Sequence, residues 1–126
     1  MKTVINTVNA PAPIGPYSQA IVAGDFIFVS GQVAIDAATG ELILDDIKTE
    51  TFKVMGNIKA ILTEAGVGFD HIVKTTIFLK DMQSFAQVNE VYSGYFTEKF
   101  PARETVAVAG LPKNVNVEIS VTALKS

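Results

Sequence analysis

A single arginine and one glutamate are the side chains of this sequence best suited to chemistry. Arg103 is the only arginine among the 10 basic residues and follows a proline break at Pro101. Its planar guanidinium can hold a carboxylate through two parallel hydrogen bonds. Glu118 is the only acid in the last strand-like segment, and a carboxylate in half-buried apolar surroundings can act as a general base. The pair favours a small anionic substrate and a reaction with water.

Both residues also have common structural roles. From position alone, Arg103 is most simply a surface arginine paired with a carboxylate such as Glu104, and such pairs contribute little to stability. Glu118 can equally be a solvated residue on the polar face of a strand. These alternatives stay open at the level of residue types.

The other candidate groups lack partners. His71 is the only histidine, and without a second histidine or a cysteine it predicts no metal site. Ser30 precedes Gly31, but no base at a recognisable spacing would make it a nucleophile. There are no cysteines, which excludes disulfides and thiolate chemistry, and no glycine-rich phosphate loop is present. We therefore expect neither a metal nor a cofactor.

Charge and hydrophobicity limit the classes of partner that this protein is expected to bind. The formal net charge is −3 and the isoelectric point is about 5.0, whereas proteins that track phosphates need clustered basic residues. We expect no nucleic-acid partner. No apolar run reaches the roughly 18 residues of a membrane span, and the N-terminus does not resemble a signal peptide. These features predict a cytoplasmic protein without a membrane partner.

The length of 126 residues predicts one domain that covers residues 1–126. Charged residues make up only 18% of the chain, against about 25% in typical soluble proteins. Because interface cores are depleted in charge, this shortage favours a chain that shares surface with other subunits.

Hydrophobic spacing predicts the elements that must position Arg103 and Glu118. Strands are expected at residues 4–8, 18–22, 26–30, 72–79, 105–109 and 115–124. A helix over 47–65 should begin at the cap Asp46 and end before Gly66. The capping box Ser84–Gln87 should begin a second helix that continues to Phe96. The resulting order, βββαβαββ, is an α+β domain with both helices on one face of a mixed or mostly antiparallel sheet.

Several short motifs occur together, in one order, along essentially the whole chain. They are Ile14-Gly15-Pro16-Tyr17-Ser18-Gln19-Ala20, Phe28-Val29-Ser30-Gly31-Gln32, Thr39-Gly40-Glu41, Val88-Asn89-Glu90-Val91-Tyr92, Phe100-Pro101-Ala102-Arg103, Leu111-Pro112 and Val117-Glu118-Ile119. In this order they resemble the RidA-like reactive intermediate deaminase family. The resemblance implies a chorismate-mutase-like fold, a homotrimer with clefts between subunits, and a role in amino-acid metabolism. The implied reaction is hydrolysis of 2-imino acids, such as 2-iminobutanoate and 2-iminopropanoate, to 2-oxo acids and ammonia.

The resemblance also implies roles for individual residues. Arg103 matches the arginine that holds the substrate carboxylate, and Glu118 matches the glutamate that positions or activates water. Further cleft-lining and substrate-binding positions are matched by Tyr17, Ser30, Gly31, Asn89 and Thr105. Glycine at position 31 would allow close backbone approach.

Three positions depart from the family pattern. Thr105 stands where many active members carry cysteine, which is compatible with a contact through the backbone N–H alone. Ala34 stands where proline is frequent, and Ser120 where a second glutamate is often found. These departures concern the choice of substrate more than membership of the family.

Two other functions remain as alternatives to the deaminase. A non-catalytic trimer that binds 2-oxo acids as a regulator would bind ligand through Arg103 without imine turnover. An endoribonuclease or translation inhibitor is an activity ascribed to some relatives, and the acidic balance of the chain weighs against it.

Overall fold

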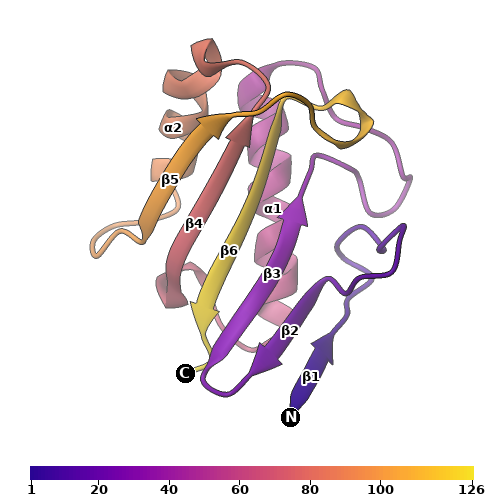
Figure 1. Ribbon diagram of the computed structural model, residues 1–126, viewed down its shortest axis with the longest axis vertical. Coiled ribbons are helices and arrows are strands. Elements are labelled where there is room, and N and C mark those ends of the chain that lie inside the picture. The colour runs from indigo at the N-terminus through magenta and orange to yellow at the C-terminus, as the bar shows by residue number, and fades with distance from the viewer.

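Six strands form one mixed sheet in the order β1-β2-β3-β6-β4-β5 (Figure 1). The computed structural model describes residues 1–126. The strands are β1 (Lys2–Ile5), β2 (Ala20–Ala23), β3 (Phe26–Gln32), β4 (Ile72–Leu79), β5 (Ala102–Ala107) and β6 (Val117–Leu124). All neighbouring pairs are antiparallel except β4 and β5, which are parallel. The helices α1 (Ile47–Glu64) and α2 (Phe85–Ser93) lie on the same face of the sheet. The α+β class and the element order are confirmed.

Helix α1 follows the local signals closely. The carboxylate of Asp46 accepts a hydrogen bond from the backbone N–H of Thr49 at 2.8 Å, so the predicted cap is present. Gly66 follows the helix with φ at 83°, the left-handed conformation that ends many helices. Phe52 of this helix is exposed and its ring lies 6.1 Å from that of Tyr95, whereas Val54 and Ile61 are buried in the core.

Strand β6 separates two environments. Its odd-numbered residues are buried in the core under the helices: Val117, Ile119, Val121 and Ala123. The alternate residues, from Glu118 to Thr122, therefore point to the face that no helix covers (Figure 1). The predicted alternation is confirmed, and Glu118 lies on the open face.

The start of α2 differs from the prediction. A 3₁₀ turn over Met82–Ser84 precedes the helix, and Asp81 caps this turn by accepting a hydrogen bond from the N–H of Gln83 at 2.9 Å. Ser84 is therefore already in a helical conformation and makes no capping bond, so the predicted capping box is wrong. The α-helix also ends at Ser93, before Phe96.

Strand boundaries shift where pairing overrides local signals. Strand β1 covers Lys2–Ile5, because these residues pair with Ala20–Ala23, and the predicted strand at 4–8 was placed too late. Strand β5 starts at Ala102 and not at residue 105, because its parallel pairing with β4 begins at Lys74. Arg103 thus lies inside a strand. No helix is long and apolar enough to span a membrane.

Candidate functional site

The predicted site residues divide between the two faces of the sheet. Arg103 pairs in register with Thr75, which is fully buried on the helix-covered face. Neighbouring residues in register point to the same side, so Arg103 faces the helices. Glu118 instead lies on the open face, since Val117 and Ile119 on either side of it are buried under the helices. A single chain therefore does not bring Arg103 and Glu118 together.

Helix α2 holds the guanidinium of Arg103. Nη1 of Arg103 donates a hydrogen bond to Oδ1 of Asn89 at 2.5 Å. The guanidinium carbon lies 5.1 Å from the ring centre of Tyr92 and 5.6 Å from that of Phe85. Because residues 85, 89 and 92 share one helix face, the two rings and the amide orient the guanidinium together.

A hollow of about 470 Å³ lies beside this arginine. Its lining residues are Asn89, Tyr92, Ser93, Phe100, Pro101 and Arg103. A guanidinium has five N–H donors, and Asn89 occupies one of them. The remaining donors can bind a carboxylate in a bidentate manner.

Thr105 lies on the same face as Arg103, two residues further along β5, and pairs with Ile77. Its Oγ1 atom is buried without a hydrogen-bond partner. Strand β5 is at the edge of the sheet, so one row of its backbone groups has no partner strand. The edge of β5 thus leaves backbone polar groups beside Arg103 without a partner strand, whereas Thr105 itself does not line the hollow.

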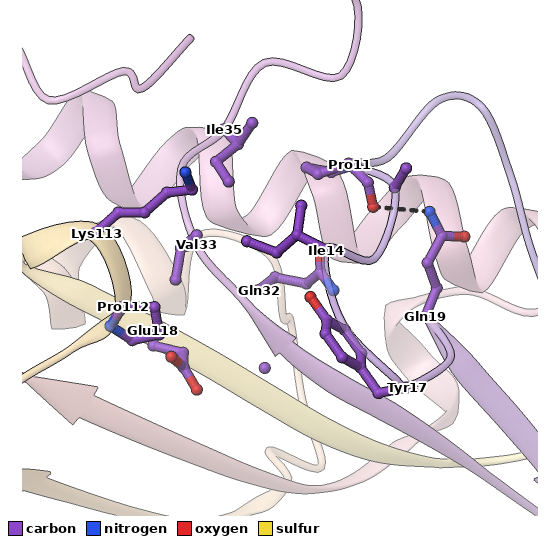
Figure 2. Close-up of a pocket in the computed structure, with 12 residues that line it drawn as sticks. Pro11, Ile14, Tyr17, Gln19, Gln32, Val33, Ile35, Pro112, Lys113 and Glu118 are labelled. Carbon is purple, nitrogen blue, oxygen red and sulfur yellow. Dashed lines mark hydrogen bonds between the residues drawn. The ribbon is translucent and has the colours of Figure 1, made fainter. Parts of the chain in front are cut away.

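Glu118 lines a separate small pocket of about 80 Å³ (Figure 2). Pro11, Ala12, Ile14, Tyr17, Gln19, Gly31, Gln32, Val33, Ile35, Pro112, Lys113 and Glu118 line it. Burial raises the pKa of Glu118 above the ordinary value of 4.5, and no neighbouring charge opposes this effect. A pocket of this size can hold water beside a carboxylate that is ready to accept a proton.

Gly31 provides the space for that carboxylate. The pairing of β3 with β6 shifts between Val29 and Gln32, which places an irregularity at Ser30 and Gly31. A Cβ atom on Gly31 would lie 2.2 Å from Oε2 of Glu118. Glycine is required here for close approach and not for its backbone angles.

The remaining predicted residues have distinct positions. Tyr17 is half-exposed and lines the Glu118 pocket, with its ring beside Gln32 (Figure 2). Ser30 does not line that pocket, and its hydroxyl donates to the carbonyl of Ser18 at 2.6 Å, which holds the loop that carries Tyr17. His71 contacts Asp70 at 3.0 Å and lines neither hollow.

Sequence reasoning missed several residues of these two sites, among them two aromatic residues beside Arg103 and two polar residues beside Glu118. Phe85 and Tyr92 flank Arg103, and their spacing from Asn89 is a helical signal that could have indicated them. Gln32 and Lys113 line the Glu118 pocket. Gln32 belongs to the Ser-Gly-Gln motif, whereas no local signal pointed to Lys113.

The six-stranded mixed sheet with two helices on one face is the chorismate-mutase-like fold. A family model described as Endoribonuclease L-PSP matches residues 7–125. A RutC family protein of Pyrococcus horikoshii is 55% identical over 125 residues, which cover 99% of each chain. The chain therefore belongs to the Endoribonuclease L-PSP family, the group of RutC and Rid proteins.

Solved structures agree over the full length. The Rid family protein YyfA of Yersinia pestis is 49% identical, with a TM-score of 0.96 and 98% of this chain and 99% of that chain covered. TdcF of E. coli, solved with bound serine, is 38% identical, with a TM-score of 0.93 and the same coverage. The serine complex shows that a relative binds a small amino acid.

Proposed function

We propose that this protein hydrolyses 2-imino acids, such as 2-iminobutanoate and 2-iminopropanoate, to 2-oxo acids and ammonia. The observation that carries the proposal is that the chain presents two unsatisfied groups on opposite faces of its sheet: a guanidinium with free donors beside a hollow, and a carboxylate of raised pKa in a water-sized pocket. The bound serine in TdcF supports a ligand that carries a carboxylate and nitrogen on the same carbon.

The proposed roles follow from the chemistry of the imine. Arg103 binds the carboxylate, with Asn89 and Thr105 beside it, and fixes the neighbouring C=N carbon. Glu118 takes a proton from water, the oxygen of that water attacks the C=N carbon, and the Glu118 carboxyl returns the proton to the nitrogen. When the C–N bond of the resulting carbinolamine breaks, the hydroxyl proton is transferred to the nitrogen through Glu118, so that ammonia leaves and the 2-oxo acid remains. The carbon is electrophilic in the imine itself, so this route requires no cofactor.

We further propose that the complete site forms between subunits of a homotrimer. The side chains of Arg103 and Glu118 project from opposite faces of the sheet. They can therefore act on one substrate only if they come from different copies of the chain. The open face is suited to burial in such an assembly, because it carries Phe26, Phe28, Val106 and Leu124 as exposed apolar residues. Light scattering should give the mass of three chains, and the mass of one chain would contradict the shared site.

Imine hydrolysis can be tested directly. We expect the protein to accelerate the loss of 2-iminobutanoate generated in the assay by a pyridoxal-phosphate-dependent dehydratase, with 2-oxobutanoate and ammonia as products. No acceleration over the uncatalysed rate would contradict the proposal. If 2-oxobutanoate then bound saturably through Arg103 without turnover, the non-catalytic regulator would replace it. RNA cleavage that is lost on substitution of Arg103 or Glu118 would support the ribonuclease alternative.

The pH dependence should reflect the burial of Glu118. Because burial raises the pKa of Glu118, the carboxylate gains its proton, and loses its function as a base, at a higher pH than an ordinary glutamate. We expect kcat/KM, corrected for uncatalysed hydrolysis, to fall on the acid side with a midpoint above 4.5. Glu118→Gln should lack this acid limb. A limb that persists unchanged in Glu118→Gln would assign the titration to another group.

A further inference from the structure

Glu50 is a fully buried carboxylate whose hydrogen bonds all go to the chain just before Glu118. It lies on α1, and its Oε2 accepts from the backbone N–H of Asn116 at 2.8 Å and from that of Val117 at 3.2 Å. Its Oε1 accepts from Nδ2 of Asn116 at 2.7 Å. Three donors thus converge on one buried carboxylate, which fixes the start of β6 to α1.

The turn just before the segment held in this way lines the Glu118 pocket. Pro112 and Lys113 line the pocket together with Glu118. Lys113 and Asn114 have φ angles of 54° and 56°, a left-handed conformation that non-glycine residues rarely adopt. Two such residues in succession persist only where the surrounding structure holds them, and Glu50 binds the chain two residues later.

Helix α1 also holds a second segment that lines the pocket. Nδ2 of Asn57, which is buried, donates to the carbonyls of Val33 and Ile35 at 3.1 Å and 3.0 Å. Val33 and Ile35 line the pocket together with Pro112 and Lys113 (Figure 2). Asn57 lies seven residues after Glu50, which is two turns along the same face of the helix. The helix is thus a rigid support to which two segments around the pocket are attached: the one at Val33 and Ile35, and the one that leads into β6.

We propose that Glu50 is a positioning residue for hydrolysis: it holds the turn before β6 so that the Glu118 carboxylate and the pocket for water stay in register. It does not touch substrate. The kinetic part of this inference rests on the proposed imine hydrolysis, whereas its structural part concerns the environment of Glu118 alone.

Substitution of Glu50 tests the inference. Glu50→Ala removes all three acceptors, and we expect kcat for 2-iminobutanoate to fall about 10- to 100-fold, since small displacements of reacting groups have effects of this size. KM should stay within about twofold, because Arg103 and Asn89 are untouched. Glu50→Gln should restore kcat, because its amide oxygen can accept from the backbone and its NH₂ group can donate to a flipped Asn116 amide.

Thr51→Val is the matched control for damage to α1. Thr51 is the next residue, is equally buried, and its hydroxyl bonds only to the carbonyl of Ile47 in its own helix at 2.7 Å. We expect its kcat to equal that of the unmodified protein. An unchanged kcat in folded Glu50→Ala, or an equal loss in Thr51→Val, would overturn the inference. If Glu50→Ala does not fold, Asn116→Ala is the alternative, because it removes one of the three hydrogen bonds and should lower kcat about threefold. An unchanged kcat in Asn116→Ala would then contradict the positioning role of Glu50.

A readout without substrate separates this inference from the proposed function. Carbon-13 NMR can follow the titration of the Glu118 carboxyl, whose surroundings in the pocket include the titratable groups of Tyr17 and Lys113. When Glu50→Ala loosens the turn before β6, water should enter and the pKa of Glu118 should fall towards 4.5, while Glu50→Gln and Thr51→Val leave it unchanged. An unchanged pKa in Glu50→Ala overturns the positioning role. Absence of imine turnover in the unmodified protein contradicts only the proposed function.

Discussion

Trimers that contain both Arg103→Ala and Glu118→Ala chains are expected to recover about one third of the unmodified imine hydrolysis, although each variant alone has lost it. Each substitution should lower kcat/KM by a factor of about 100 or more, because one removes the carboxylate clamp and the other the general base. In a site shared by two copies, a functional combination needs intact Arg103 from one copy and intact Glu118 from its neighbour. In a trimer that holds both kinds of chain, about one site in three provides this combination.

The experiment depends on proof of mixing. Chains with two different affinity tags can be unfolded together, refolded and purified through both tags in sequence, so that only mixed oligomers are assayed. Arg103→Ala mixed with the double variant Arg103→Ala/Glu118→Ala is the control, since no site in it can contain Arg103. Verified mixed oligomers without recovered activity would show that Arg103 and Glu118 do not serve one shared site.

Gly31→Ala is expected to lower imine hydrolysis nearly as much as removal of Glu118 itself. The added Cβ would lie 2.2 Å from Oε2 and 2.8 Å from Cδ of Glu118, well inside contact distance, so the carboxylate must leave its place in the pocket. The chain around it cannot easily yield, because Ser30 is bonded to Ser18 and Gln32 is buried. We expect kcat to fall about 100-fold, and a crystal structure should show Glu118 in another rotamer.

Gly110→Ala provides the matched control for this prediction. A Cβ on Gly110 meets nothing within 4 Å, and its φ lies outside the left-handed region. Its activity should equal that of the unmodified protein. Full activity in Gly31→Ala, with Glu118 in its original place, would show that the pocket adapts and that its close packing has no part in catalysis.

Local signals along the chain determined a large part of the fold. The three- and four-residue spacing of apolar residues, the cap Asp46 and the terminal Gly66 act within a few residues, so α1 was predicted almost to its ends. Alternation in β6 likewise placed Glu118 on the face opposite the core. The capping box at Ser84 failed because Asp81 caps an earlier turn, and two competing local signals cannot be ranked without the surrounding structure.

The residue types of the candidate site could also be predicted from the sequence, because it has a single arginine and a single acid in its last strand. The geometry of these residues could not be predicted from the sequence. Parallel pairing with β4 decides that Arg103 lies inside β5 and faces α2, and the shifted register of β3 on β6 decides that Gly31 lies against Glu118. The role of Glu50 depends on contacts with a segment 66 and 67 residues away. Periodicity acts over a few residues, whereas register, face and long-range hydrogen bonds are set only when distant segments pack together.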